Sequence, residues 1–170
     1  MSSFNRALAP FALIGALTLG GCIQPLYGPL AADAPLVADL QAIAIDDIPD
    51  RLGHYVKNEL VFAFNGTGSE VAPRYRLKVT MSERVQTPIL DTVTGRATSA
   101  TVIVDAKYKL TTIASDVVVT EGVAFGVASY DRFSNRFANL RAARDSEIRD
   151  AKTIADQIRT RVAAALASRS

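Results

Sequence analysis

Alternating apolar and polar residues predict three β-strands in the middle of the chain. Across residues 74–81 the odd-numbered positions are apolar and the even-numbered positions are polar, so one strand face is expected in a core and the other in solvent. Residues 101–111 repeat this alternation, and residues 117–130 form a third β-rich stretch. Turn-forming pairs at residues 94–95 and 115–116 separate the three segments. Long strands joined by short turns predict an antiparallel meander.

A spacing of three to four residues between apolar positions predicts two helices. Apolar residues recur every four positions after Pro49, where a helix loses no hydrogen bond to a proline, and this pattern predicts a helix over residues 50–64. A longer apolar stripe predicts an amphipathic helix from about 135 to 167, and a break near Arg144 remains an alternative. The residues of this stripe are Phe137, Leu140, Ile148, Ala151, Ile154, Ile158, Val162 and Leu166.

A further strand is expected before the first helix. Residues 40–45 are short, apolar and bounded by acidic residues, which is typical of a strand that is buried on both faces. The element order is then β-α-β-β-β-α, and because one sheet face is polar, the helices are expected on the other. Residues 39–170 are therefore predicted to be a single α+β domain. It is a two-layer sandwich of a four-stranded, mainly antiparallel sheet with two helices on one face.

The N-terminus carries a short uncharged run followed by the only cysteine. Residues 7–20 are 14 positions without charge, and since a membrane-spanning helix needs about 20 apolar residues, this run is typical of a secretory signal instead. Cys22 follows two glycines directly, where small residues suit a signal peptidase. A secreted protein with a chance cysteine near its cleavage site is the alternative. Residues 22–38 are rich in proline and predict a flexible, extended tether.

Residues 19–22, Leu-Gly-Gly-Cys, resemble the bacterial lipobox. The resemblance implies that residues 1–21 are a lipoprotein signal peptide and that Cys22 carries a diacylglyceryl group on its thiol and an acyl group on its amine. Each buried CH₂ adds about 0.8 kcal/mol, so several chains give a stable anchor. Asp after the cysteine resembles an inner-membrane retention signal in enterobacteria, and Ile23 in its place favours the outer membrane.

Little in the sequence points to catalysis. His54 is the only histidine and lies in the predicted first helix, where a structural role on the helix is expected. Asp46, Asp47 and Asp50 offer oxygen ligands for Ca²⁺, but turns and helix capping explain them more simply. We expect a protein without enzymatic activity, cofactor or metal site. With 19 basic against 17 acidic residues, bulk charge gives no reason to expect a nucleic-acid partner.

A stripe of basic residues is the strongest candidate for ligand binding. Residues 71–113 are net basic, and the alternation predicts that cations from two strands project from one solvent-exposed sheet face. These candidate residues are Arg74, Arg76, Lys78, Lys107 and Lys109. Arginine and lysine both bind phosphate, so a phosphorylated lipid A sugar would suit the face. A charged face that only keeps the sheet soluble is the alternative.

Small residues line one face of the last predicted strand. They are Gly122, Ala124, Gly126 and Ala128. Such a stripe allows another protein to approach closely, and a thin, twisted strand without a partner is the simpler interpretation.

The chain resembles the LPS-assembly lipoprotein family LptE, in its alphaproteobacterial branch. The resemblance rests on residues 19–22, on Gln-Pro-Leu-Tyr-Gly at residues 24–28, and on the element order with its long terminal helix. It implies a lipoprotein on the periplasmic face of the outer membrane that plugs the β-barrel LptD and assists lipopolysaccharide assembly into the outer leaflet. The alternative is a periplasmic auxiliary lipoprotein of an ABC-type lipid or solute transporter, and a lipoprotein hydrolase is a third class.

Overall fold

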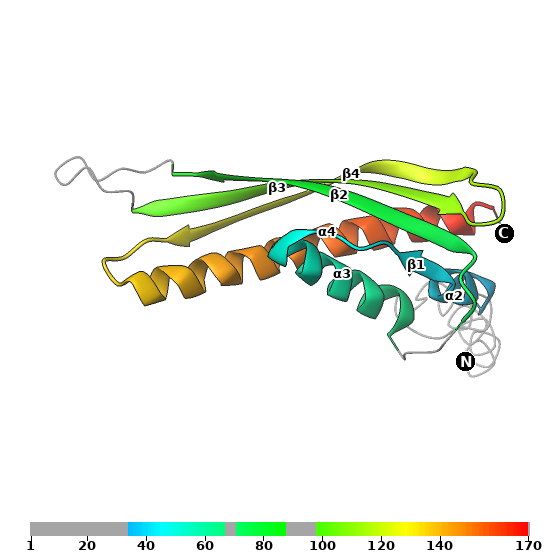
Figure 1. The fold of residues 1–170 in the computed structure, drawn as a ribbon, viewed down its shortest axis with the longest axis horizontal. Coiled ribbons are helices and arrows are strands. Elements are labelled where there is room, and N and C mark those ends of the chain that lie inside the picture. Colours follow the sequence, from blue (N-terminus) through cyan, green and yellow to red (C-terminus); the bar gives the residue numbers. More distant parts are fainter. Residues whose placement is uncertain (1–33, 67–70, 88–97, 170) are drawn as a thin grey trace, which may run out of the picture. The chain divides into compact units, whose positions relative to one another are not determined.

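In the computed structural model, which describes residues 34–66, 71–87 and 98–169, a four-stranded sheet forms one layer and α-helices form the other (Figure 1). In chain order the elements are α2 (Ala34–Gln41), β1 (Ile43–Ile45), α3 (Asp50–Asn65), β2 (Tyr75–Gln86), β3 (Ser99–Thr112), β4 (Val118–Asp131) and α4 (Arg136–Ala167). The predicted α+β class is confirmed. The predicted signal peptide, Cys22 and the turn at residues 94–95 lie outside the described residues.

The sheet has the order β1-β2-β3-β4, and its alternation separates a buried face from an exposed one. Leu77 of β2 lies opposite Leu110 of β3, and Val79 lies opposite Tyr108, in an antiparallel pairing that covers all of β2. These four side chains are buried, whereas the polar residues between them face solvent. β4 continues the antiparallel pairing on the other side of β3. The predicted meander of three long strands is confirmed.

The chain before Pro49 differs from the prediction. Residues 34–41 form α2, where the sequence predicts an extended tether and then a strand. Pro35 is the second residue of this helix, where its missing N–H costs no hydrogen bond, so here the proline begins a helix. β1 has only three residues; it pairs in parallel with β2 at the sheet edge, and its side chains are half-buried instead of buried on both faces.

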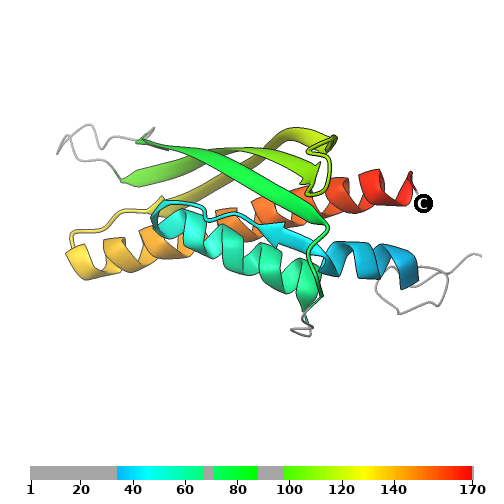
Figure 2. The ribbon, with the colours of Figure 1, turned by 45° about the vertical axis from the view of Figure 1, so that its right-hand side comes forward.

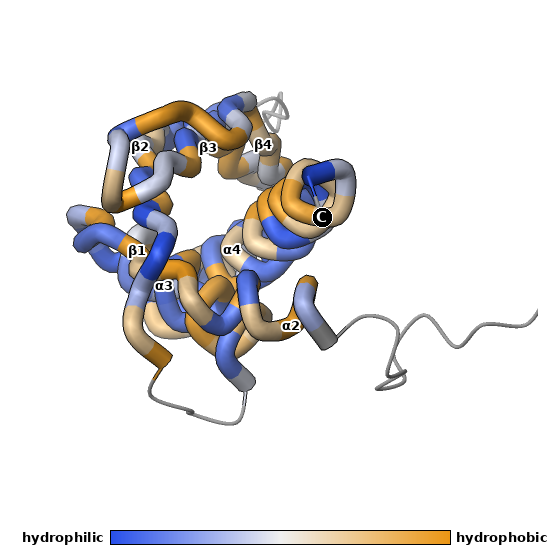
Figure 3. Tube along the Cα trace, turned by 90° about the vertical axis from the view of Figure 1, so that its right-hand side faces the viewer, coloured by the Kyte–Doolittle hydropathy of each residue, from blue (hydrophilic) through white to orange (hydrophobic). Residues whose placement is uncertain are grey.

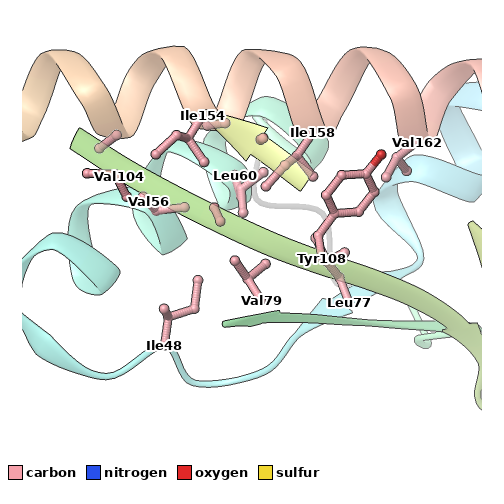
Figure 4. Packing of buried hydrophobic residues seen from close by; sticks show 14 of the residues in the cluster. Ile48, Val56, Leu60, Leu77, Val79, Val104, Tyr108, Ile154, Ile158 and Val162 are labelled. Atoms are coloured by element: carbon pink, nitrogen blue, oxygen red, sulfur yellow. The ribbon is translucent and has the colours of Figure 1, made fainter. Parts of the chain in front are cut away.

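Both predicted helices are present, and α3 and α4 cover the apolar face of the sheet (Figures 2 and 3). α4 runs through Arg144 without a break, and the side chain of Asn135 caps its N-terminus by accepting hydrogen bonds from two backbone N–H groups. In the core, side chains of both helices meet those of β2 and β3 (Figure 4). The labelled residues are Ile48, Val56, Leu60, Leu77, Val79, Val104, Tyr108, Ile154, Ile158 and Val162.

The small residues of β4 make room for other parts of the same chain. A Cβ at Gly126 would lie 2.9 Å from Cβ of Asp150, so only glycine lets α4 pack this close to the strand. A Cβ at Gly122 would lie 2.8 Å from the hydroxyl oxygen of Tyr108. The stripe is therefore filled from within the domain, and neither interpretation made from the sequence alone describes it.

Side chains of α4 also occupy the free edge of β4. Gln157 Nε2 donates to the carbonyl of Phe125 at 2.8 Å, and the N–H of Phe125 donates to Gln157 Oε1 at 3.2 Å. Arg149 donates to the carbonyl of Ser129, and Arg161 to that of Val123. These edge groups therefore find hydrogen-bond partners within the chain.

Candidate functional site

Four of the five predicted basic residues lie on the exposed face of the sheet. Arg76 and Lys78 of β2 alternate with buried residues, as do Lys107 and Lys109 of β3, and all four point away from the helices. The register places Lys78 directly opposite Lys109, and Lys107 opposite Thr80. The strands thus bring the four cations together, as the alternation predicts.

Arg74, the fifth predicted residue, is held by another element. It lies one residue before β2, and its guanidinium forms an ion pair with Asp39 of α2. The same guanidinium lies 5.8 Å from the ring centroid of Tyr75. Because both contacts come from the chain itself, Arg74 is less available to a ligand than the four residues on the strands.

Positive charge on this face is offset only in part, by Glu121 of β4, which lies opposite Lys109 in the register. Nε of Arg76 lies 3.8 Å from Oδ1 of Asp46, whereas Lys78, Lys107 and Lys109 form no ion pair with any residue that the structure describes. Like charges placed directly opposite each other on a sheet destabilise it. The domain therefore tolerates a concentration of positive charge that an anion would relieve. We call Lys78, Lys107 and Lys109 the lysine cluster.

Two shallow hollows adjoin the lysine cluster. The first has a volume of about 390 Å³ and extends from Lys78 and Thr80 to Glu121 and Val123 of β4. The second, of about 360 Å³, reaches from Lys78 to Asp46 and Asp116. Lys78 and Lys109 line both hollows. Glu121 is opposite Lys109 in the register, so a bound anion is expected nearer to Lys78 and Lys107 than to β4. The face can hold an anionic group by charge-assisted hydrogen bonds.

The other polar candidates from the sequence have structural roles. His54 is exposed on α3, and its Nε2 lies 3.1 Å from Asn58 Nδ2. Asp46 pairs with Arg76, and Lys57 donates a hydrogen bond to Asp47 that lowers the pKa of that carboxyl. Within residues 34–66, 71–87 and 98–169, no group of three or more His, Cys, Asp and Glu side chains is placed to hold a metal ion.

Acidic side chains are buried at the interface of α4 and the sheet, and the periodicity of the sequence does not predict this burial. Asp150 is 1% exposed, and burial raises the pKa of its carboxyl to about 6. Glu147, one turn earlier, is buried and accepts hydrogen bonds from Nε and Nη2 of Arg51. The pKa of Glu83 on β2 is raised, first by burial and then by Glu147. The only sequence signal was that Glu147 and Asp150 share the helix face of Ile154.

The first half of α4 leaves apolar side chains in solvent. Phe137, Leu140 and Ile148 line a groove of about 740 Å³ together with Arg51, Arg141 and Arg144. None of the helices in the part of the chain that the structure describes is both long and apolar enough to cross a membrane.

The fold is shared with bacterial lipoproteins of known structure. A protein of Caulobacter crescentus CB15 assigned as a lipoprotein matches with a TM-score of 0.67 at 22% identity, over 79% of this chain and 97% of its own. The minor lipoprotein of Acinetobacter baumannii matches with a TM-score of 0.55 at 14% identity, over 73% and 92%. At these identities the similarity establishes the fold and leaves function to the site.

A third lipoprotein of known structure matches more weakly. The rare lipoprotein B of Shewanella oneidensis has a TM-score of 0.46 at 16% identity, over 74% of this chain and 92% of its own. This TM-score is too low to establish a common fold. The chain matches no known family model, and it matches no curated protein.

Proposed function

We propose that this chain is an outer-membrane lipoprotein that partners and plugs an LptD-like β-barrel and assists lipopolysaccharide assembly into the outer leaflet. The lipobox-like residues 19–22 support the anchor, with diacylglyceryl and N-acyl groups on Cys22. Two proteins of the same fold are lipoproteins by name. The resemblance of residues 24–28 and of the element order to the LptE family supports the barrel partner. The role is one of binding and assembly, without catalysis.

The observation that carries the proposal is the lysine cluster. Lipid A carries phosphate groups on a sugar backbone, and lysine binds phosphate as a point charge while Arg76 offers the planar guanidinium that suits two phosphate oxygens. Lys78 of β2 lies beside the lysines of β3, so one phosphate bound next to Lys78 and Lys107, away from Glu121, would contact both strands. The phosphorylated head of lipopolysaccharide would lie on the sheet, and the helices on the other face would remain undisturbed.

The barrel partner fits the distribution of polarity. On β2 and β3 the exposed sheet face is polar and charged around the lysine cluster, whereas β4 adds the exposed Phe125 and Val127; the lumen of a large outer-membrane barrel is also polar. A domain of this type would meet the lumen wall through polar contacts. In this arrangement the lysine cluster would lie close to the lipid headgroup as it passes the barrel.

The proposal is tested by charge reversal in the full chain, expressed with a C-terminal tag in a Gram-negative bacterium. The double variant Lys78→Glu/Lys107→Glu is compared with Lys152→Glu, which reverses an exposed lysine of α4 on the other layer. Protein extracted from outer membranes is assayed for bound lipopolysaccharide and for a co-purifying barrel. Charged hydrogen bonds contribute about 1.5–3 kcal/mol each, so we expect the double variant to bind lipopolysaccharide at least about tenfold more weakly.

The two assays separate the parts of the proposal. The control Lys152→Glu should bind lipopolysaccharide as the original chain does, all three proteins should retain the barrel, and neither variant should have a lower melting temperature. Equal lipopolysaccharide binding by all three proteins would show that the lysine cluster does not bind lipopolysaccharide. Recovery with an inner-membrane ATPase in place of a barrel would contradict the barrel partnership and favour an auxiliary lipoprotein of a transporter.

A further inference from the structure

The first turns of α4 present an apolar stripe to solvent. Phe137 is 78% exposed and Leu140 is 62% exposed, and Ile148 continues the stripe at helical spacing. Further along, the same side of α4 is buried at Ala151 and Ala155. α3 begins at Asp50, and its Arg51 contacts Glu147, so the first turns of α4 extend past the start of α3 (Figures 1 and 2). The stripe is therefore exposed because α3 does not reach the first turns of α4.

Local hydrogen bonds hold the exposed aromatic residues in place. The N–H of Phe133 donates to Asn139 Oδ1 at 2.7 Å, and Asn139 Nδ2 donates to the carbonyl of Phe133 at 2.7 Å. Asn135 caps the helix between them by accepting from the N–H groups of Phe137 and Ala138. Phe133 is 63% exposed although its backbone is fixed in this way. The backbone under the patch is thus preorganised, which lowers the entropic cost of binding.

Arginines surround this patch. Arg132 precedes Phe133 and Arg136 precedes Phe137 in the sequence, and Arg141 and Arg144 line the groove that contains Phe137 and Leu140. Among the described residues, none of these four arginines forms an ion pair, whereas Arg51 and Arg149 are paired with Glu147 and Asp145. The patch therefore combines exposed apolar side chains with an excess of positive charge, because Asp145, the acidic residue that lines the groove, is paired with Arg149.

We propose that this arginine-flanked stripe binds the surface of a bilayer that contains anionic phospholipid. An amphipathic helix with aromatic residues on one side and arginines beside them lies in the membrane interface, where apolar groups enter the acyl boundary and guanidinium groups bind lipid phosphates. Anionic headgroups supply the charge that four unpaired arginines require. The contact is separate from the lysine cluster, because it lies on α4 and not on the exposed face of the sheet, and it does not require lipopolysaccharide.

The absence of tryptophan from the chain allows a clean fluorescence test. Phe137→Trp places a single reporter in the stripe of the full chain, which is recovered from bacterial membranes and reconstituted into vesicles. Phosphatidylcholine vesicles are compared with vesicles that also contain phosphatidylglycerol. We expect the emission maximum to move to shorter wavelength only with the anionic lipid, since only then does the indole enter the interface.

A matched reporter stands on α3. Phe62 is 72% exposed, and residues 58–65 around it contain no arginine or lysine, so Phe62→Trp tests exposure without positive charge. Its emission should stay the same in both kinds of vesicle. In the Phe137→Trp background, Arg141→Gln and Arg144→Gln should each reduce the ratio of inserted to free protein about fivefold.

Three results would overturn the proposal. The first is an unchanged emission of the Phe137→Trp variant in anionic vesicles, and the second is an equal shift in the emission of the Phe62→Trp variant. The third is a shift that appears only when a barrel protein is present in the vesicles, which would identify a protein as the partner of the stripe.

Discussion

The two faces of the sheet come from the same strands but differ in their surroundings. Leu110 of β3 points into a dry core between the sheet and the helices, whereas its neighbour Lys109 points to solvent among other cations. Period-two alternation lets one strand contribute to both surfaces. Stability therefore depends mainly on the inner face, while the outer face carries charge at small cost. The two can therefore be changed independently.

The largest expected effect is on the inner face. Leu110→Ala removes a fully buried side chain and should lower the free energy of unfolding by about 3 kcal/mol, because lost burial and a remaining cavity add together. Lys109→Ala, one residue away and exposed, should change it by less than about 0.5 kcal/mol. Urea unfolding at neutral pH measures both. Similar losses for the two variants would mean that the faces do not differ as described.

An intermediate effect is expected at Asp150, a carboxyl group on the inner side. Its folded-state pKa of about 6 is above the ordinary value of 3.8, so between these pH values the folded chain binds more protons than the unfolded chain. Stability from this group is present below about pH 4 and is lost as the pH rises through 6. Asp150→Asn, which does not ionise, should escape this loss, which is about 3 kcal/mol in full and about 2 kcal/mol between pH 4 and pH 7.5.

The check is thermal or urea unfolding of both proteins at pH 4 and pH 7.5. Relative to the original chain, Asp150→Asn should gain stability at the higher pH. Asp156→Asn, an exposed change on the same helix, should follow the original chain at both values. A parallel pH dependence for the original chain and Asp150→Asn would show that Asp150 ionises normally.

The smallest effect is expected on the outer face and has the opposite sign. Lys78→Glu replaces a repulsion with Lys109 by an attraction, and it should raise the free energy of unfolding by about 0.4 kcal/mol. The same change should weaken binding of inorganic phosphate or lipopolysaccharide. A gain in stability together with a loss of binding would show that this face serves binding, whereas the core serves stability. A clear loss of stability would show that Lys78 supports the fold.

Much of the fold could be predicted from the sequence because its periodicities are strong. The helix predicted over residues 50–64 is α3, and the helix predicted from about 135 to 167 is α4. The prediction of an extended segment and a strand over residues 34–42 was wrong, since proline suits both a tether and the first turn of a helix. Local pattern could not decide between these, because packing against the domain selects the helix.

The candidate site was only partly predictable. Alternation placed Lys78 and Lys109 on the same kind of face, but the register that sets them opposite each other depends on the pairing of β2 with β3 over 12 residue pairs. Glu147 and Asp150 are charged residues on a buried helix face, and sequence patterns favour exposure for such residues. Their burial follows from the close approach of α4 to Gly126 and from Arg51 of α3, both distant in the sequence.

The contacts of α4 with the free edge of β4 have a consequence for molecules at high concentration. An unpaired edge strand is a template on which identical chains add, and repeated addition gives fibrils. Gln157 offers a donor and an acceptor to Phe125 in the way that a backbone amide of an incoming strand would. α4 thus occupies the edge of β4 at which the strand of another chain would otherwise pair. A substitution at Gln157 would consequently promote self-association first. The highest concentration at which the protein remains monomeric would fall.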